Sequence, residues 1–209
     1  MQRIVISDDH SMLSMMFKIW FQQLGLDVEV VATPTNGKAT LEAVRKYQPD
    51  VLVQDMMLHD MDGVSIIQHL RVDFPKLRIF AMSAKPAYAK AALDAGADGC
   101  MLKEDHPQVI RQALEWDLSK GKWVSPLLQD KILNAVANMR KYDFTQSEMN
   151  VLRLAHLPNL DIASALGLSE GTVRNLFTVV YQKTGTTIRA ELADLAHNVL
   201  LLNPSPDAR

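Results

Sequence analysis

Residues 51–63 read "VLVQDMMLHDMDG": an apolar run ends in an aspartate, and further acids and a glycine follow. An uninterrupted apolar run is typical of a strand buried on both faces, as in a parallel sheet. A lone aspartate after a strand is usually a turn residue or a helix cap, and Asp62 before Gly63 fits the start of a helix. Asp55 needs another explanation, because it ends the buried run itself.

Outward from this stretch, four similar runs occupy residues 3–7, 28–33, 78–83 and 97–102. Helical patterns such as "GKATLEAVRKY" lie between them, and Gly25 and Gly96 stand where helices are expected to end. Five strand–helix units predict a doubly wound α/β domain with five parallel strands. The working crevice of such a domain lies at the carboxyl ends of its strands.

Polar residues stand at the carboxyl ends of four of these strands. In chain order they are Asp8 and Asp9, Asp55, Ser83 and Lys103. Three converging carboxylates repel one another unless a cation is bound, and Mg²⁺ prefers carboxylate oxygens and water. One carboxylate could then attack phosphorus and form an acyl phosphate, with the hydroxyl and the ammonium group stabilising the phosphoryl oxygens.

These motifs resemble the receiver domain of two-component response regulators, which has a flavodoxin-like fold, and the likeness covers residues 1–119. "IVISDDH", "VLVQDMML", "AMSA" and "GADGCMLKED" match the family's acidic pair, phosphoacceptor strand, hydroxyl residue and lysine strand. The resemblance implies that Asp55 takes the phosphoryl group and that Ser83 and Lys103 respond to it. The implied ligands of Mg²⁺ are Asp8, Asp9, Asp55 and the backbone carbonyl of Met57.

Two residues depart from the family's pattern. His59 stands where proline is usual, and Cys100 replaces the aromatic residue three positions before the lysine. A cysteine cannot fill the volume of that aromatic ring, so the coupling from Asp55 to the output surface is expected to be weak or to use other residues. We interpret Cys100 as a buried strand residue rather than a redox sensor, and His10 and His59 as neutral surface residues near the pocket rim.

A different class of protein would use similar groups. Haloacid-dehalogenase-type phosphatases also have a strand-end aspartate, a hydroxyl, a lysine and Mg²⁺, but they need a second aspartate where Met57 stands. Their accessory acids also follow the lysine, whereas the acidic pair precedes it in this chain. The sequence therefore favours a protein that is not an enzyme beyond its own phosphorylation and dephosphorylation.

The second half of the chain changes to helical patterns. Residues 120–143 are predicted to form a basic linker with an amphipathic helix, and residues 144–209 a compact helical domain. Thr145 and Glu148 have the spacing of a capping box. Two helices joined by a tight turn at Gly167, with Ser169 as the cap of the second, predict a helix-turn-helix.

"IASALGLSEGTVR" at 162–174 and "KTGTTIRAEL" at 183–192 resemble the LuxR-type DNA-binding domain of NarL/FixJ regulators. The resemblance implies that the helix after Ser169 enters the major groove of double-stranded DNA. On that helix Arg174, Asn175 and Thr178 are expected near bases, because arginine recognises guanine and asparagine recognises adenine. The residues expected at phosphates are Thr172, Lys183 and Arg189.

Charge complicates the DNA-binding prediction. Residues 145–209 hold five basic and six acidic residues, whereas DNA-binding domains normally show a basic footprint. Weak binding by one copy favours a homodimer, and the last helix carries an apolar stripe that could pack on a second copy or on its own domain. The alternatives are a protein-interaction module with a DNA-incompetent helical domain, or a regulator that acts without phosphorylation.

The whole chain fits a cytoplasmic two-domain regulator. It has 209 residues, a net charge of −2 and a single cysteine, so no intramolecular disulfide can form. The sequence shows no signal peptide and no transmembrane stretch. The expected partners are a sensor histidine kinase or a small phosphodonor, DNA and a second copy.

Overall fold

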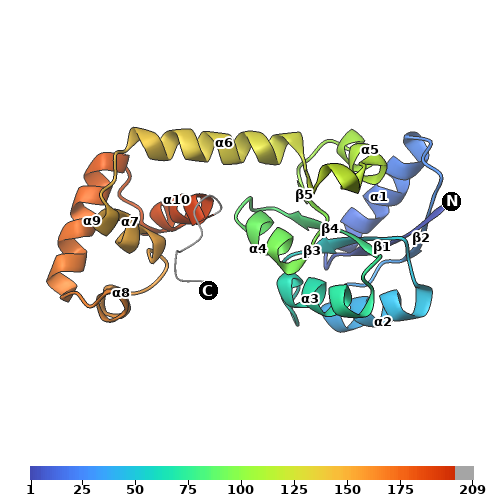
Figure 1. Ribbon diagram of the computed structural model, residues 1–209, viewed down its shortest axis with the longest axis horizontal. Coiled ribbons are helices and arrows are strands. Elements are labelled where there is room, and N and C mark those ends of the chain that lie inside the picture. The colour runs from blue at the N-terminus through green and yellow to red at the C-terminus, as the bar shows by residue number, and fades with distance from the viewer. Residues whose placement is uncertain (201–209) are drawn as a thin grey trace. The chain divides into compact units, whose positions relative to one another are not determined.

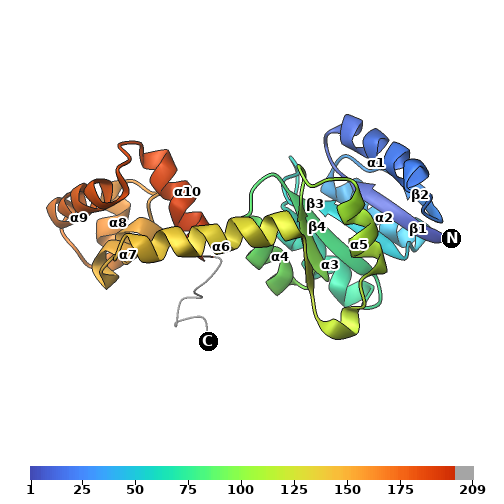
Figure 2. The same cartoon turned by 90° about the horizontal axis from the view of Figure 1, so that it is seen from above.

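A computed structural model describes residues 1–200 (Figures 1 and 2). The side chains of residues 135, 136, 138–140, 194 and 197–200 are not described. The chain divides into two units, Met1–Gln129 and Asp130–Arg209. Among the residues described, none of the helices combines the length and the apolar character needed to cross a bilayer.

The first unit contains a parallel sheet with the strand order β2-β1-β3-β4-β5-β6. Five strands match the predicted runs: β1 (Gln2–Ser7), β2 (Val28–Ala32), β3 (Val51–Asp55), β4 (Arg78–Ser83) and β5 (Gly99–Leu102). A sixth strand, β6 (Trp123–Val124), was not predicted, because two residues carry no recognisable pattern. The order of the first five strands is that of flavodoxin-like folds, which confirms the predicted fold class.

Two layers of helices cover the sheet. Figure 1 shows α1 (Ser11–Gln23) and α5 (Gln108–Glu115) on one face, with α2 (Gly37–Tyr47), α3 (Gly63–Asp73) and α4 (Tyr88–Ala95) on the other. On the first face Phe17, Phe21 and Ile110 pack against alternate strand residues such as Ile6 and Val53. Every residue of β3 is buried, which explains its uninterrupted apolar run.

The turn after β3 brings the first residue of α3 into close contact with the end of β3. Asp62 caps α3 by accepting a hydrogen bond from the backbone N–H of Ser65 at 2.9 Å, as predicted. A Cβ at Gly63 would lie 2.7 Å from Cα of Met56 and 2.9 Å from the carbonyl oxygen of Asp55. Glycine is therefore required where α3 begins directly behind Asp55.

The first unit extends beyond the predicted boundary at residue 119. A short 3₁₀ helix (Leu118–Lys120) and β6 lead into α6 (Pro126–Lys141), and Ser125 and Leu128 are buried. The division between the units falls inside α6, which corresponds to the predicted linker helix.

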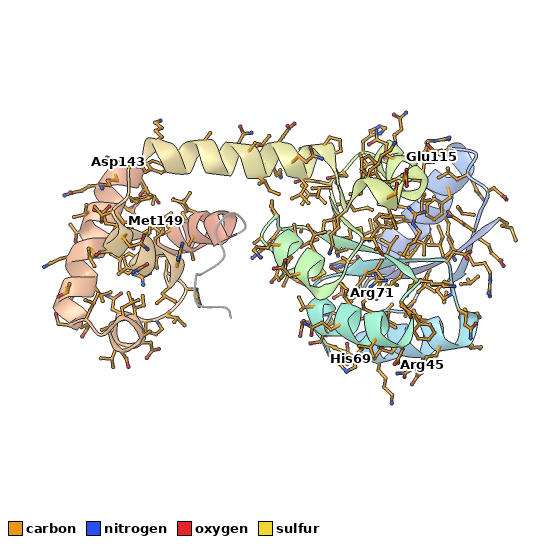
Figure 3. All side chains as sticks on the ribbon, viewed as in Figure 1. Arg45, His69, Arg71, Glu115, Asp143 and Met149 are labelled. Carbon is orange, nitrogen blue, oxygen red and sulfur yellow. The ribbon has the colours of Figure 1, made fainter. Side chains whose placement is uncertain are left out.

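The second unit is helical, with α7 (Gln146–Arg153), α8 (Asn159–Leu166), α9 (Glu170–Thr184) and α10 (Arg189–Leu200). Both hydrogen bonds of the predicted capping box at Thr145 are present. Figure 3 shows Met149 on α7, where it packs against the core of this unit. That core is formed by Val151, Leu152, Ala155, Ile162, Ala163, Val173, Phe177, Val180, Leu192 and Ala196.

The last helix packs on its own domain where its side chains are described. Leu192 is fully buried and Ala196 is 2% exposed, and both belong to the core of the second unit. This part of the apolar stripe is therefore used within the domain. The stripe beyond Ala196 lies outside the described side chains.

Candidate functional site

Three carboxylates meet at the carboxyl edge of the sheet. Asp8 and Asp9 follow β1, and Asp55 ends β3, the neighbouring strand. One oxygen from each of these residues and one ring nitrogen of His10 all lie within 4.8 Å of one another. Asp8 is completely buried and Asp55 is 2% exposed. The acids of the first and third strands thus share one pocket, as the strand order requires.

Lys103 follows β5 and contacts two of these carboxylates. Its Nζ lies 2.8 Å from Oδ2 of Asp55 and 2.7 Å from Oδ2 of Asp8. Burial raises the pKa of Asp55, and the hydrogen bond and charge of Lys103 offset this rise only in part. Burial alone would lower the pKa of Lys103, but its two carboxylate partners outweigh burial and leave that pKa raised. The ammonium group is therefore held charged beside Asp55.

Ser83 and Met57 lie in the same pocket, which has a volume of about 770 Å³. Oγ of Ser83, at the end of β4, accepts a hydrogen bond from the backbone N–H of Lys85 at 3.0 Å. The backbone N–H of Met57 donates to Oδ1 of Asp55 at 3.2 Å. The structure therefore gathers the hydroxyl, the lysine and the acids that the sequence places at four separate strand ends.

Two carboxylate oxygens in this pocket have unused hydrogen-bonding capacity. Oδ2 of Asp8 and Oδ1 of Asp9 are buried and accept no hydrogen bond from the described residues. Each has a nitrogen nearby, since Nζ of Lys103 lies 2.7 Å from the first and Nδ1 of His10 lies 2.7 Å from the second. Three carboxylates beside a single ammonium group leave a surplus of negative charge that suits a bound cation, and this set of oxygen ligands fits Mg²⁺.

Two histidines contact Asp9, which sequence reasoning did not predict. Nε2 of His59 lies 3.0 Å from Oδ2 of Asp9, and Nδ1 of His10 also lies 3.3 Å from Oδ1 of Asp8. The rings are largely exposed, in keeping with a place at the rim, but they are not isolated surface residues. The contact of His59 could not be read from the sequence, because it joins loops that are fifty residues apart.

Cys100 is buried on β5, as interpreted from the sequence. Its Sγ lies 3.5 Å from the carbonyl oxygen of Ala89, and burial raises the pKa of the thiol to about 12. The thiol is protonated at neutral pH and unreactive. Tyr88 of α4 lines both the 770 Å³ pocket and a small void beside Cys100, so an aromatic ring lies close by although residue 100 is not aromatic.

In the second unit, four of the six candidate DNA contacts are exposed on α9: Thr172, Arg174, Asn175 and Thr178. Ser169 caps this helix by accepting a hydrogen bond from the backbone N–H of Thr172 at 3.1 Å. Arg174 forms an ion pair with Glu170 one turn earlier at 3.0 Å. This ion pair was not predicted, although residues four apart on a helix are neighbours and the spacing can be read from the sequence.

Lys183 and Arg189 are partly buried, and the domain itself uses their donors. Nζ of Lys183 lies 2.6 Å from the carboxylate of Glu148 and 2.8 Å from the carbonyl oxygen of Asp143. The guanidinium of Arg189 donates to the carbonyl oxygens of residues 155 and 157 and stacks on the ring of Phe177, 3.5 Å from its centroid. Neither side chain shares the exposed surface of α9 with the other four.

Comparisons with known families match both units. Residues 4–115 match the family described as "Response regulator receiver domain". Residues 143–196 match the family described as "Bacterial regulatory proteins, luxR family".

Individual relatives cover most of the chain. The "Uncharacterized transcriptional regulatory protein YvfU" of Bacillus subtilis is 32% identical over 81% of this chain and 84% of its own length. The "Response regulator protein VraR" of Staphylococcus aureus is 27% identical over 95% of this chain and 98% of its own. RcsB of Salmonella enterica serovar Typhimurium, solved on the promoter rprA with the phosphomimetic BeF3-, is 26% identical with a TM-score of 0.64, covering 95% of this chain and 100% of its own.

Proposed function

Because this chain belongs to the two-component response regulators of the NarL/FixJ family, with a receiver domain and a LuxR-type DNA-binding domain, we propose that phosphorylation of Asp55 controls how its helical domain binds double-stranded DNA. The observation that carries the proposal is the single pocket in which Asp55, Lys103 and two further acids meet. The family consists generally of transcription factors that are not enzymes.

In the proposed reaction, a carboxylate oxygen of Asp55 attacks the phosphorus of a phosphohistidine on a sensor kinase, or of a small phosphodonor. The new O–P bond forms as the bond from phosphorus to the donor breaks, and the donor leaves with the electron pair. Lys103, already charged beside Asp55, neutralises a phosphoryl oxygen. Positioning and charge neutralisation are the main contributions a protein makes to such a transfer.

Asp8, Asp9, Asp55 and the backbone carbonyl of Met57 would hold Mg²⁺. The convergence of three carboxylates, with oxygens within 4.8 Å of one another, supports this assignment. When bound, Mg²⁺ would neutralise charge on the carboxylates and on the incoming phosphoryl group.

Ser83 is the proposed link from the phosphoryl group to the domain surface. Its hydroxyl lies in the pocket, bonded to the backbone of Lys85, and it could exchange this partner for a phosphoryl oxygen. Because residue 100 is a cysteine, it has no aromatic ring that could move together with the hydroxyl of Ser83. Tyr88 lines the void beside Cys100, and its ring is the candidate for that movement. Phosphorylation would act by favouring one of two arrangements of these side chains.

The exposed residues of α9 would read DNA. Arg174, Asn175 and Thr178 are assigned to base edges and Thr172 to a phosphate. Lys183 and Arg189 are reassigned to holding the domain together, because their donors are used internally. The low charge of the domain supports binding as a homodimer, and a structure of two RcsB dimers bound to two parallel DNAs offers a parallel. A regulator of this kind works in the cytoplasm, where DNA and kinase domains are found.

The test uses DNA selected from a random-sequence library by phosphorylated full-length protein. We expect binding to this DNA to tighten at least tenfold when wild type is incubated with acetyl phosphate and Mg²⁺, and not to change in Asp55→Asn. Equal binding in both states would support the phosphorylation-independent alternative, and failure to select any DNA would support a protein-interaction module. Steady turnover of an unrelated phosphomonoester would support the hydrolase alternative.

A further inference from the structure

We propose that Leu128, in the first turn of the linker helix α6, couples the phosphorylation pocket to the helical domain. A side chain of the linker occupies space beside Cys100, and its displacement carries the signal along α6. This rests on the proposed function and goes beyond it by naming the residue through which the signal leaves the receiver domain.

Leu128 packs the start of α6 against the receiver domain. It is 1% exposed, and it is the one buried side chain among those of α6 that the structure describes. Leu133, on the same helix, is 64% exposed. The division between the two units falls directly after this first turn, between Gln129 and Asp130. The apolar attachment of α6 to the receiver domain therefore depends mainly on Leu128.

The backbone before Leu128 is bonded to β5 at Cys100. The backbone N–H of Ser125 donates to the carbonyl oxygen of Cys100 at 3.0 Å, next to the paired residues of β5 and β6. Ser125 is completely buried, and its Oγ accepts a hydrogen bond from the backbone N–H of Leu128 at 3.3 Å. Ser125 thus caps α6 while it is bonded to the sheet, so a displacement of Leu128 acts directly on the start of the helix.

A small void connects Leu128 with residues of the phosphorylation pocket. Its lining includes Ser83, Tyr88, Cys100 and Leu128, and its volume is about 10 Å³. A void of this size holds one water molecule at most, because a water needs about 10–15 Å³. Protein interiors are packed so closely that a larger group enters only by displacing a neighbour. The ring of Tyr88 can therefore occupy the space beside Cys100 only if another lining residue moves.

The other walls of the void are held more firmly than Leu128. Residues of β4 and β5 are paired with a neighbouring strand on each side. On the side of α4, the carbonyl oxygen of Ala89 lies 3.5 Å from Sγ of Cys100. Leu128 belongs to a helix end, and it is the lining residue that can leave without breaking the sheet. A cysteine at position 100 leaves room for Leu128 that a larger side chain would take.

Phosphorylation would disturb this arrangement through Ser83. When the Ser83 hydroxyl turns to a phosphoryl oxygen, it gives up its place beside the void, and the ring of Tyr88 moves toward Cys100. The ring displaces Leu128, and the cap of α6 loses the packing that supports it. Because α6 continues into the second unit, the altered helix start is passed to the helical domain.

The test follows amide hydrogen exchange of residues 125–129 in the full-length chain, with and without acetyl phosphate and Mg²⁺. The variants are Leu128→Ala, the conservative Leu128→Met, and Leu133→Ala as the matched control. In wild type we expect phosphorylation to speed exchange in this segment at least tenfold. Leu133→Ala should behave like wild type, and Leu128→Met should retain most of the response, because methionine conserves the apolar volume.

Leu128→Ala should separate phosphorylation from its output. Residues 125–129 of this variant should exchange rapidly without phosphorylation, and phosphorylation should add less than twofold. Its gain of a phosphoryl group by intact mass and its exchange over β3 should match wild type, which would show that the pocket is intact. Phosphorylation should then tighten its binding to the selected DNA less than threefold, against at least tenfold in wild type.

The outcomes separate this inference from the proposed function. Tighter DNA binding by phosphorylated wild type with unchanged exchange of residues 125–129 would overturn the role of Leu128 and leave the proposed function standing. A full DNA response in Leu128→Ala would do the same. A Leu128→Ala chain that gains no phosphoryl group would show that Leu128 is only a structural residue, which also overturns the inference. Failure of wild type to gain a phosphoryl group would overturn both.

Discussion

At the scale of single residues, the same type of side chain serves different purposes in the two units. Lys103 is a cation placed beside buried carboxylates in a pocket open to ligands. Arg189 is also a cation, but its guanidinium group donates hydrogen bonds to backbone carbonyls and stacks on the ring of Phe177. A basic residue near a DNA-reading helix is therefore not evidence of a phosphate contact until its partners are known.

Replacing Arg189 should destabilise the helical domain rather than only weaken DNA binding. We expect Arg189→Ala to cost about 2–4 kcal/mol, because several hydrogen bonds from a charged group and a cation–π contact are lost together. Arg189→Lys should recover less than half of this, since lysine lacks the planar fork. Thermal unfolding of the full chain, with hydrogen exchange over residues 146–196, measures the loss. Unchanged stability with weakened DNA binding would instead return Arg189 to the phosphate contacts.

At the scale of elements, the capping box of α7 is tied to α9 through Glu148. The Glu148 carboxylate accepts hydrogen bonds from the backbone N–H of Thr145 and from Lys183, which fixes the start of one helix against the end of another. Burial alone would raise the pKa of Glu148, but Lys183 and Thr145 outweigh it, so this pKa is lowered. The ionised form therefore stabilises the fold.

This lowered pKa gives the helical domain a dependence on pH. The contribution of Glu148 should be fully present above its unfolded pKa of about 4.3 and lost as pH falls through the lower folded pKa. At neutral pH Glu148→Gln should be less stable by about 1–3 kcal/mol, and the gap to wild type should close below about pH 4. Hydrogen exchange of residues 146–153, compared at equal pH, measures this gap. A gap that stays constant down to pH 3 would contradict the assigned role of Glu148.

The elements also show what sequence can and cannot predict. Asp55 and Ser83 could be predicted as site residues because each ends an apolar run. A parallel sheet brings the carboxyl ends of its strands to the same edge. The short strand β6 could not be predicted, because two residues are too few to show a repeating pattern of apolar side chains. The contact of His59 with Asp9 and the internal partners of Lys183 depend on tertiary packing between distant segments, which a local pattern does not specify.

At the scale of the whole molecule, two units with different chemistry lie on one chain. The first holds the acidic pocket. The second presents an exposed helix surface, and residues 145–209 together hold five basic and six acidic residues. With little general attraction to phosphates, specific contacts must supply more of the DNA affinity. The proposed base contact of Arg174 would also require this side chain to leave Glu170, its ion-pair partner.

Arg174 should accordingly matter for sequence preference. We expect Arg174→Ala to weaken binding to selected DNA by about 1–3 kcal/mol and to relax preference at one base position. The matched control is Gln182→Ala, at an exposed position of α9 one turn beyond Thr178, which should leave affinity and preference close to those of wild type. Selection from a random library, repeated for each variant, reveals the preference. A uniform loss across sequences would make Arg174 a phosphate contact.

The proposed function requires that Asp55 accept a phosphoryl group in a pocket that uses a divalent cation. Intact mass spectrometry after incubation with acetyl phosphate tests it most directly, for wild type and Asp55→Asn, with Mg²⁺ and with a chelator. We predict a gain of one phosphoryl group in wild type with Mg²⁺ only. The same gain in Asp55→Asn, or no gain in wild type under any condition, would rule out Asp55 as the phosphoacceptor.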